Sequence, residues 1–237
     1  MLTPSRCGRM DQCVVMGREA VGLMTFHSTY CTLMRLEHVG SPLYFVVVDL
    51  KSHKDTMVIL RELNSCFPFP KDEKQALMHE YVQQNVVITR EQAVHAIMEG
   101  DVAALAGLMQ RSQALFDAAG VAICPDQLTS PVLHSLINDP VLLKQQPATA
   151  ADTTAADTTV ADTVVVNKEE EEDLGGLPLP LALAVKGVGS QGDGTAQILC
   201  ATKEQQQRVL EYVENNYKMQ AFLLTIPQQQ VHNNIGY

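Results

Sequence analysis

A glycine-rich loop near the C-terminal end has the composition of a ligand-binding turn. The stretch KGVGSQGDGTAQILC, residues 186–200, holds four glycines within eight positions: Gly187, Gly189, Gly192 and Gly194. Such backbone approaches a ligand closely, most often a phosphate, because it carries no Cβ and readily adopts positive φ. Ser190 and Asp193 lie among these glycines, and a carboxylate about 4 Å from a phosphate charge costs roughly 4 kcal/mol at an effective dielectric of about 20. We therefore expect the loop to lie beside a phosphate site, with Asp193 pointing away toward a substrate hydroxyl, a cation or the adjacent Lys186.

A second carboxylate, near the N-terminus, has the setting of a general base. Gly8 permits a tight turn in PSRCGRMDQCVVMG, residues 4–17, and Asp11 follows between Met10 and the apolar CVVM. Apolar neighbours can tune the pKa of a carboxylate and fix its direction. Asp11 could equally be the N-cap of a helix that begins at Gln12. Both interpretations stay open on the residues alone.

Other residue types with chemical potential are dispersed. Four basic residues lie near the ends of the expected strands: Arg6, Arg9, Lys51 and Lys54. Each could face a phosphate, although the surface is the commoner place for such side chains. The six cysteines and seven histidines lack the paired spacing that a zinc site requires. We expect buried, reduced thiols and no metal site within this chain.

Composition narrows the class of protein. The 237 residues are 46% hydrophobic, which suits one large globular domain or two small ones. A net charge of −10 and the absence of tryptophan argue against a nucleic-acid surface, which needs basic and stacking side chains. No apolar run approaches the ~20 residues of a membrane helix, and the first residues lack the apolar stretch of a secretory signal. A cytoplasmic protein is expected.

Hydrophobic periodicity predicts the elements that must position the loop. Three strands are expected at 21–26, 31–36 and 43–50, the last being the buried run LYFVVVDL. Helical spacing follows over 55–63, 72–83 and 89–98, with Thr89 as an N-cap, and over 101 to about 119, ended by Gly120. A further helix is predicted with Pro131 in its first turn and a cap at Thr129 or Ser130.

The last third of the chain changes character twice. Residues 145–176 contain near-repeats of Ala-Asp-Thr and the run KEEEED, which predicts a disordered acidic insertion because little apolar surface is available to offset ordering. A strand, the glycine loop, a second strand, a helix over 203–217, a closing strand QAFLLTI and a polar tail at 228–237 follow. This order differs from a Walker loop or a Rossmann turn, because each of those opens onto a helix.

Three motifs together resemble those of the GHMP kinases, the superfamily of galactokinase, homoserine kinase, mevalonate kinase and phosphomevalonate kinase. They are GRMDQ, GLMTF and GVGSQGDG; CGRMDQ is close to the GIMDQ of galactokinases, and the last resembles the family's GAGxGG. The resemblance implies that Asp11 is the catalytic carboxylate beside the phosphate-accepting hydroxyl. It also implies that Gly187 to Gly192 lie beside the nucleotide phosphates and the substrate. Gln191 and Asp193 depart from the pattern, since a glycine and a small or thiol residue are usual there.

The same resemblance implies an α+β fold in two parts. Residues 1–63 would be the remnant of an N-terminal domain of the ribosomal-S5-domain-2 type. Residues 64–144 and 177–227 would form a C-terminal ferredoxin-like, α/β-plait domain, with LFDAAGVAICPDQLTSPVLHSLI as its linking stretch. The family's phosphate loop, PxxxGLGSSAA, and its magnesium-binding serine and glutamate belong to an N-terminal part that this sequence does not contain. As a kinase the chain is therefore expected to be incomplete.

The activity implied is transfer of the γ-phosphoryl group of ATP to a hydroxyl of a small molecule, a sugar or sugar acid. ATP and Mg²⁺ would be the cofactors, and Arg9, Lys51 and Lys186 are possible basic contacts. Two other classes remain: a non-catalytic binding or regulatory module derived from the kinase C-terminal domain, and an unrelated α+β scaffold with a coincidental glycine turn.

Overall fold

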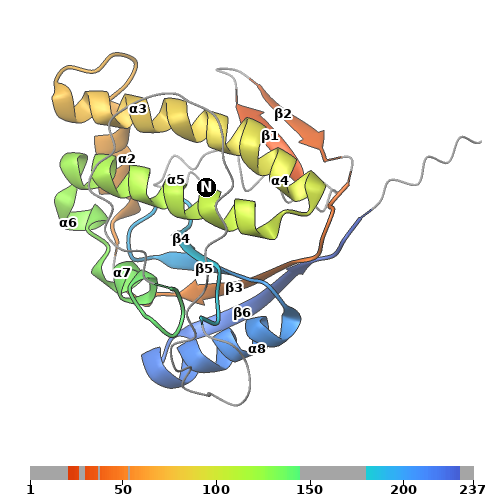
Figure 1. The fold of residues 1–237 in the computed structure, drawn as a ribbon. Helices are drawn as coiled ribbons and strands as arrows, with labels where there is room; N and C mark the ends of the chain where they lie inside the picture. The colour runs from red at the N-terminus through yellow and green to blue at the C-terminus, as the bar shows by residue number, and fades with distance from the viewer. Residues whose placement is uncertain (1–20, 27–29, 37, 53, 145–179, 230–237) are drawn as a thin grey trace, which may run out of the picture.

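The computed structural model describes residues 21–26, 30–36, 38–52, 54–144 and 180–229. Asp11, Arg9 and the predicted insertion at 145–176 lie outside the described residues. A small antiparallel hairpin comes first, formed by β1 (Gly22–Phe26) and β2 (Cys31–Arg35). Figure 1 shows this hairpin next to α4 and apart from the main sheet.

The main sheet has four antiparallel strands in the order β4-β5-β3-β6. These are β3 (Leu43–Asp49), β4 (Ala184–Gly187), β5 (Thr195–Cys200) and β6 (Gln220–Ile226). Val46 lies opposite Ile198 on β5 and opposite Leu223 on β6, so β3 is central. The sheet therefore crosses the domain boundary predicted at residue 63, because β3 pairs with the two strands that were assigned to the C-terminal part.

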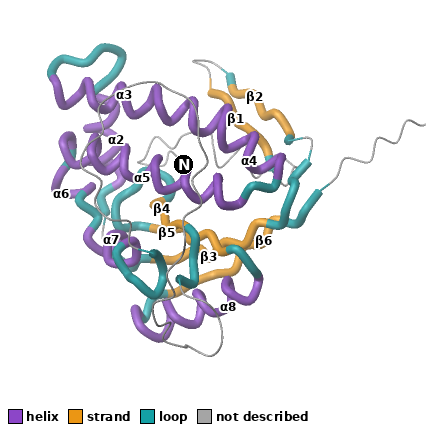
Figure 2. Tube along the Cα trace, in the orientation of Figure 1, coloured by secondary structure: helices purple, strands orange, loops and turns teal. Residues whose placement is uncertain are grey.

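Helices cover both faces of this sheet, as Figure 2 shows. On one face, α8 (Lys203–Tyr212) and the π-helical turn η2 (Val213–Tyr217) bury Val209 and Val213 against Val46 and Ile198. On the other, α5 (Val102–Ile123) buries Leu105 and Met109 against Phe45. The alternation of side chains along β3 makes both faces apolar, as expected of a central strand.

The remaining helices pack around α5. They are α2 (Thr56–Ser65), α3 (Glu73–Val87), α4 (Val94–Glu99), α6 (Pro125–Leu128) and α7 (Pro131–Ile137), with a π-helical turn η1 (Ile88–Ala93) between α3 and α4. Ile59, Met78 and Phe116 join α2, α3 and α5 in a third apolar cluster. The predicted junction at 99–101 is confirmed: Gly100 has φ 74° and Asp101 accepts a hydrogen bond from the Ala104 amide.

Two predicted helix boundaries are wrong. Thr89 caps nothing, because the helix continues through η1 without a break; the preceding Val86, Val87 and Ile88 contain no helix-breaking residue. Gly120 is not the end of α5 but a buried interior position. A Cβ there would lie 3.0 Å from Phe116 and 3.2 Å from Leu128, which explains the glycine by packing.

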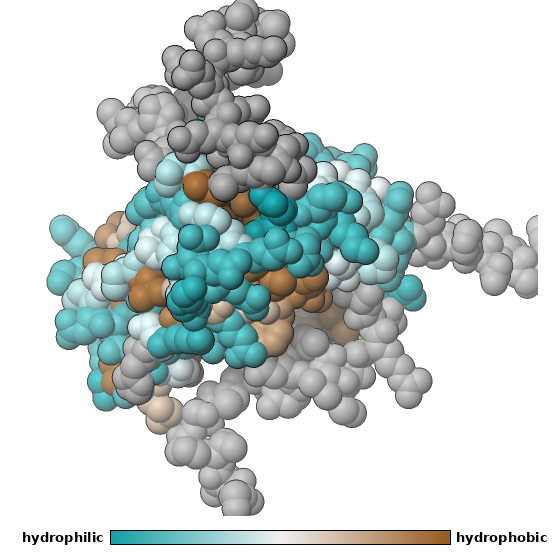
Figure 3. Space-filling model, turned by 90° about the horizontal axis from the view of Figure 1, so that it is seen from below, coloured by the Kyte–Doolittle hydropathy of each residue, from teal (hydrophilic) through white to brown (hydrophobic). Residues whose placement is uncertain are grey.

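The outer strand β6 leaves apolar side chains at the surface. Phe222, Leu223 and Leu224 are 52%, 47% and 48% exposed. Viewed from below in Figure 3, the surface is mostly hydrophilic with separate hydrophobic areas. An uncharged, apolar edge strand of this kind can pair with another chain.

Candidate functional site

The predicted loop is the turn that joins β4 to β5. The Val188 amide donates to the Thr195 carbonyl at 3.0 Å and closes its base. Gly189, Gln191 and Gly192 all have left-handed backbone, with φ of 68°, 63° and 72°. Left-handed backbone costs a non-glycine residue roughly 1 kcal/mol or more, so Gln191 must be held there by its surroundings. A Cβ on Gly189 would meet no atom within 4 Å, so the tip of the loop is open.

The Asp193 carboxylate caps helix α7 from a distant part of the sequence. Its Oδ1 accepts a hydrogen bond from the Leu133 amide at 2.8 Å, and its Oδ2 accepts one from the Val132 amide at 3.1 Å. Of the two predicted caps, Thr129 and Ser130, the N-cap position is Ser130, which has φ 48° and makes no side-chain cap bond. Asp193 is only 6% exposed, and its charge is satisfied by amides that would otherwise be unpaired. The structure thus gives Asp193 a partner other than Lys186 or an open substrate site.

Lys54, which the sequence identified only as one of several basic residues, is hydrogen-bonded to the loop. The Lys54 ammonium donates to the Gln191 carbonyl at 2.9 Å and to Ser190 Oγ at 3.3 Å. Burial lowers the pKa of Lys54. A Cβ on Gly194 would lie 2.5 Å from Lys54 Cε, so a larger residue at 194 would push the Lys54 side chain out of its present position.

Two more of the predicted basic contacts, Lys186 and Lys51, are engaged within the protein, whereas Arg6 and Arg9 lie outside the described residues. The Lys186 ammonium donates to the Gly187 carbonyl at 3.2 Å, and burial lowers the pKa of Lys186. The Lys51 ammonium donates to the Lys218 carbonyl at 2.9 Å, next to the start of β6. Lys51 therefore lies at the same end of the sheet as the loop, but its ammonium is bonded to the segment that leads into β6.

A polar network on α5 and α7, which the sequence did not reveal, anchors the first glycine. The Gly187 amide donates to Gln113 Oε1 at 2.8 Å, and Gln113 Nε2 donates to Asp117 Oδ1 at 2.7 Å. His134 Nε2 lies 3.4 Å from Asp117 Oδ2, and the hydrogen bond with Asp117 raises the pKa of His134. Gln113 and Asp117 are one helical turn apart, and this spacing is the feature of the sequence that could have predicted their contact.

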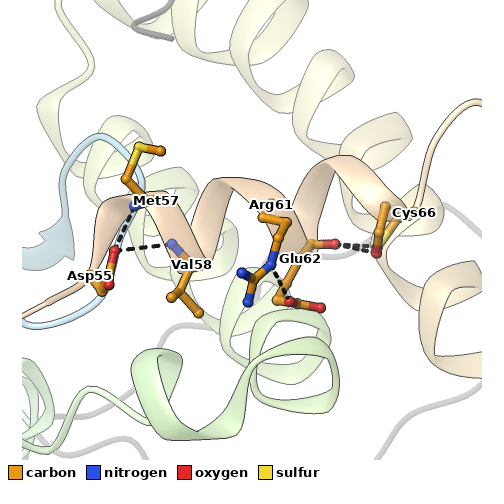
Figure 4. Close-up of polar contacts among 7 residues, drawn as sticks. Asp55, Met57, Val58, Arg61, Glu62 and Cys66 are labelled. Atoms are coloured by element: carbon orange, nitrogen blue, oxygen red, sulfur yellow. Dashed lines mark hydrogen bonds and ion pairs between the residues drawn. The ribbon is translucent and has the colours of Figure 1, made fainter. Parts of the chain in front are cut away.

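Helix α2 fixes the position of Lys54. Figure 4 shows Asp55 Oδ1 accepting hydrogen bonds from the Met57 and Val58 amides, at 2.9 and 3.1 Å, which caps the helix. Farther along α2, the Arg61 side chain pairs with the Glu62 carboxylate. The Glu62 backbone carbonyl accepts a hydrogen bond from the Cys66 thiol. The Asp55 amide in turn donates to Gln127 Oε1 at 2.7 Å. The N-terminal end of α2, next to Lys54, is thereby tied to α6.

Chemically, the loop presents a preorganised backbone rather than reactive side chains. Its exposed tip carries Val188 and Gly189, whereas the carboxylate and the ammonium beside it are already hydrogen-bonded. Across the described ranges, no group of three or more His, Cys, Asp or Glu residues gathers that could hold a metal ion. In the same residues, no helix is both long and apolar enough to cross a membrane.

Comparison with known proteins places the fold. No family model and no curated protein matches the sequence. Among solved structures, L. major mevalonate kinase in complex with R-mevalonate matches 88% of this chain and 49% of its own length, at 14% identity and a TM-score of 0.53. Lactococcus lactis galactokinase complexed with galactose matches 96% and 57%, at 12% identity and a TM-score of 0.53.

A Lin0012 protein from Listeria innocua matches 84% of this chain and 43% of its own length, at 15% identity and a TM-score of 0.53. The chain thus spans about half the length of these structures. At identities this low, the comparison establishes a shared fold and no further property. The chain has the α+β, GHMP kinase-like fold that its three motifs predicted.

Proposed function

We propose that this chain supplies the C-terminal share of an active site that transfers the γ-phosphoryl group of ATP to a hydroxyl of a small molecule. The observation that carries the proposal is the β4–β5 loop, held by Gln113, by Lys54 and by the bonds of Asp193 to α7. Phosphoryl transfer depends mainly on positioning and charge stabilisation. A rigid backbone turn with an open tip suits that task.

Each part of the proposed site has its own role. Asp11 would orient the acceptor hydroxyl and take its proton, which as general-base help is worth about 10²- to 10⁴-fold in rate. Backbone amides around Gly189 and Ser190 would face the transferring phosphates from the side. ATP supplies the phosphoryl group and Mg²⁺ neutralises phosphate charge; the described residues offer no cluster to hold this ion, so we assign it no ligands here.

For the acceptor we propose a sugar or sugar acid in the cytoplasm. The closeness of CGRMDQ to the galactokinase form supports this choice over an isoprenoid alcohol. Two of the structural neighbours are complexed with R-mevalonate and with galactose. These two compounds are therefore the natural first acceptors to compare.

A glycine substitution with a matched control tests the proposal. Purified chain is incubated with ATP, Mg²⁺ and either galactose or mevalonate, and ADP release and binding are measured. Gly189→Val places a branched side chain at the open tip, where the left-handed backbone also strains it. It should reduce turnover at least tenfold, and circular dichroism checks that the remaining fold persists. Gly107→Ala, on α5 where a Cβ also meets nothing within 4 Å, should leave turnover unchanged. Measurable turnover that is equal in both variants would contradict a role for the loop.

A second candidate, a binding module without catalysis, is favoured by one observation. The charged groups at the loop, Asp193 and Lys54, are both occupied by bonds within the protein. Calorimetric binding of ATP or galactose with no ADP release would support this candidate and end the kinase proposal for the isolated chain. An Asp11→Asn variant separates the two, because only the kinase should lose a measurable rate.

A further inference from the structure

We infer that a pocket behind the glycine loop binds a small organic anion, either a carboxylate or a phosphate ester, independently of the proposed phosphoryl transfer. The pocket has a volume of about 480 Å³ and lies between α5, α7 and β4. This volume is within the range of small-molecule sites. Its wall mixes apolar side chains such as Val185 with Gln113, Asp117, His134 and Lys144.

The charges on this wall favour an anion. The Asp117 carboxylate is already matched, with one oxygen accepting from Gln113 and the other facing His134. Lys144 is exposed and forms no ion pair within the described part of the chain. The Lys186 ammonium lies near enough for Asp117 to raise the pKa of Lys186 against the effect of burial. When His134 is protonated, it and Lys144 place two cations on the pocket wall beside the already bonded Asp117, in a chain whose net charge is −10.

The edge of β4 adds a backbone donor to these cations. Residues of an antiparallel strand alternately face the partner strand and turn away from it. The Val188 amide points to β5, where it bonds Thr195, whereas the Gly187 amide points to α5, where it bonds Gln113. Val185, two residues before Gly187, consequently turns its N–H toward α5 and the pocket. An anion seated beside Val185 would be hydrogen-bonded by this N–H and paired with His134 and Lys144.

Occupation of the pocket should be felt in the glycine loop. Its two walls are the elements that hold the loop, since Gln113 on α5 bonds Gly187 and the first turn of α7 bonds Asp193. An anion that draws His134 away from Asp117 would alter the Gln113 bond in turn. The amide resonance of Gly187 is therefore a reporter that does not depend on catalysis.

The test is a titration of the full ¹⁵N-labelled chain with sulfate and then with citrate, at constant ionic strength. Sulfate keeps its charge between pH 6 and 8, so changes in its affinity report the protein. We expect saturable shifts of the Val185 and Gly187 amides. Lys144→Gln and His134→Asn should each weaken binding about fivefold, the effect of losing one partly exposed charge contact. Lys74→Gln, an exposed lysine on α3, is the control and should change nothing.

The pH dependence gives a second readout. The neighbouring Asp117 raises the pKa of His134, with a smaller contribution from Asp193. Lys144 lines the same pocket, and Lys186 lies near Asp117. Below this raised pKa the imidazolium is present, so sulfate should bind more tightly at pH 6 than at pH 8. Absence of saturable shifts, or an affinity that neither substitution nor pH alters, would overturn the inference. Should His134→Asn fail to fold, the exposed Lys144→Gln variant still decides it.

Discussion

Removal of the Asp193 carboxylate should destabilise the protein rather than weaken a ligand contact. In Asp193→Ala, the Val132 and Leu133 amides, now bonded at 3.1 and 2.8 Å, would lose their acceptors at a position that is 6% exposed. A buried amide left without a partner costs about 1–3 kcal/mol. Two such amides, less the desolvation of the carboxylate that is removed, give a loss of about 3 kcal/mol in the free energy of unfolding.

Asp193→Asn should cost about half as much, because the amide oxygen can still accept one of the two bonds while its NH₂ group faces a donor. The control is Thr202→Ala at the N-cap of α8, where one side-chain bond of 3.2 Å caps an exposed helix end. That substitution should cost about 1 kcal/mol. The assay is urea unfolding followed by circular dichroism at 222 nm, with the three variants and the parent compared at equal slope.

The ranking of these variants decides between two roles for Asp193. A loss in Asp193→Ala no larger than that in Thr202→Ala would refute the capping argument. A substrate contact would instead appear as unchanged unfolding by urea together with weaker binding of ATP or of the acceptor. We expect the free energy of unfolding to fall in Asp193→Ala. Any loss of ATP or acceptor binding should result only from displacement of the loop.

Three further predictions concern the surroundings of the loop and the outer strand. Gly194→Ala would place a Cβ 2.6 Å from the Lys54 ammonium and should lower the melting temperature, by the equivalent of about 1–2 kcal/mol; an unchanged temperature would mean that Lys54 moves freely. Because Asp117 raises the pKa of His134, this pair should stabilise the fold below the unfolded pKa of about 6.5, and the contribution should be lost as pH rises through the folded pKa. In a ¹H NMR titration, the pKa of His134 should be lower in Asp117→Asn than in the parent, and an unchanged pKa would contradict the pairing. Leu223→Lys on β6, where Leu223 is 47% exposed, should reduce self-association in sedimentation without lowering stability, and continued association would place the contact elsewhere.

The sequence predicted the elements better than their ends. Strand β3 could be recognised because LYFVVVD is apolar on both faces, and the junction at Gly100 and Asp101 because each residue suits its backbone role. Gly120 was misread as a helix end because local rules cannot see Phe116 and Leu128 packed over it. Thr89 was misread as a cap for a different reason, because a residue that can cap a helix is also tolerated within one.

The candidate site was predictable as a loop but not as a network. Composition located the glycines, and the left-handed backbone at Gly189 and Gly192 is the conformation that glycine favours. The partners of the loop lie 60 residues away for Asp193 and Leu133, and 74 residues away for Gly187 and Gln113. Only the pairing of β4 with β5 and the packing of α5 and α7 against β4 bring them together. No spacing rule reaches across such distances.

The hydrogen bonds of Asp193 explain how a carboxylate can lie within a loop of the phosphate-binding type. The repulsion of roughly 4 kcal/mol applies to a free charge at about 4 Å, whereas Asp193 is buried and faces the positive end of α7. Its charge is offset by two amide donors and by the orientation of the peptide dipoles in that first turn. The same bonds fix the loop at residue 193, while Lys54 fixes it at Gln191 and Gln113 fixes it at Gly187. Between these anchors only Val188, Gly189 and Ser190 retain appreciable exposure. A ligand of the loop would therefore contact these three residues, chiefly through their backbone.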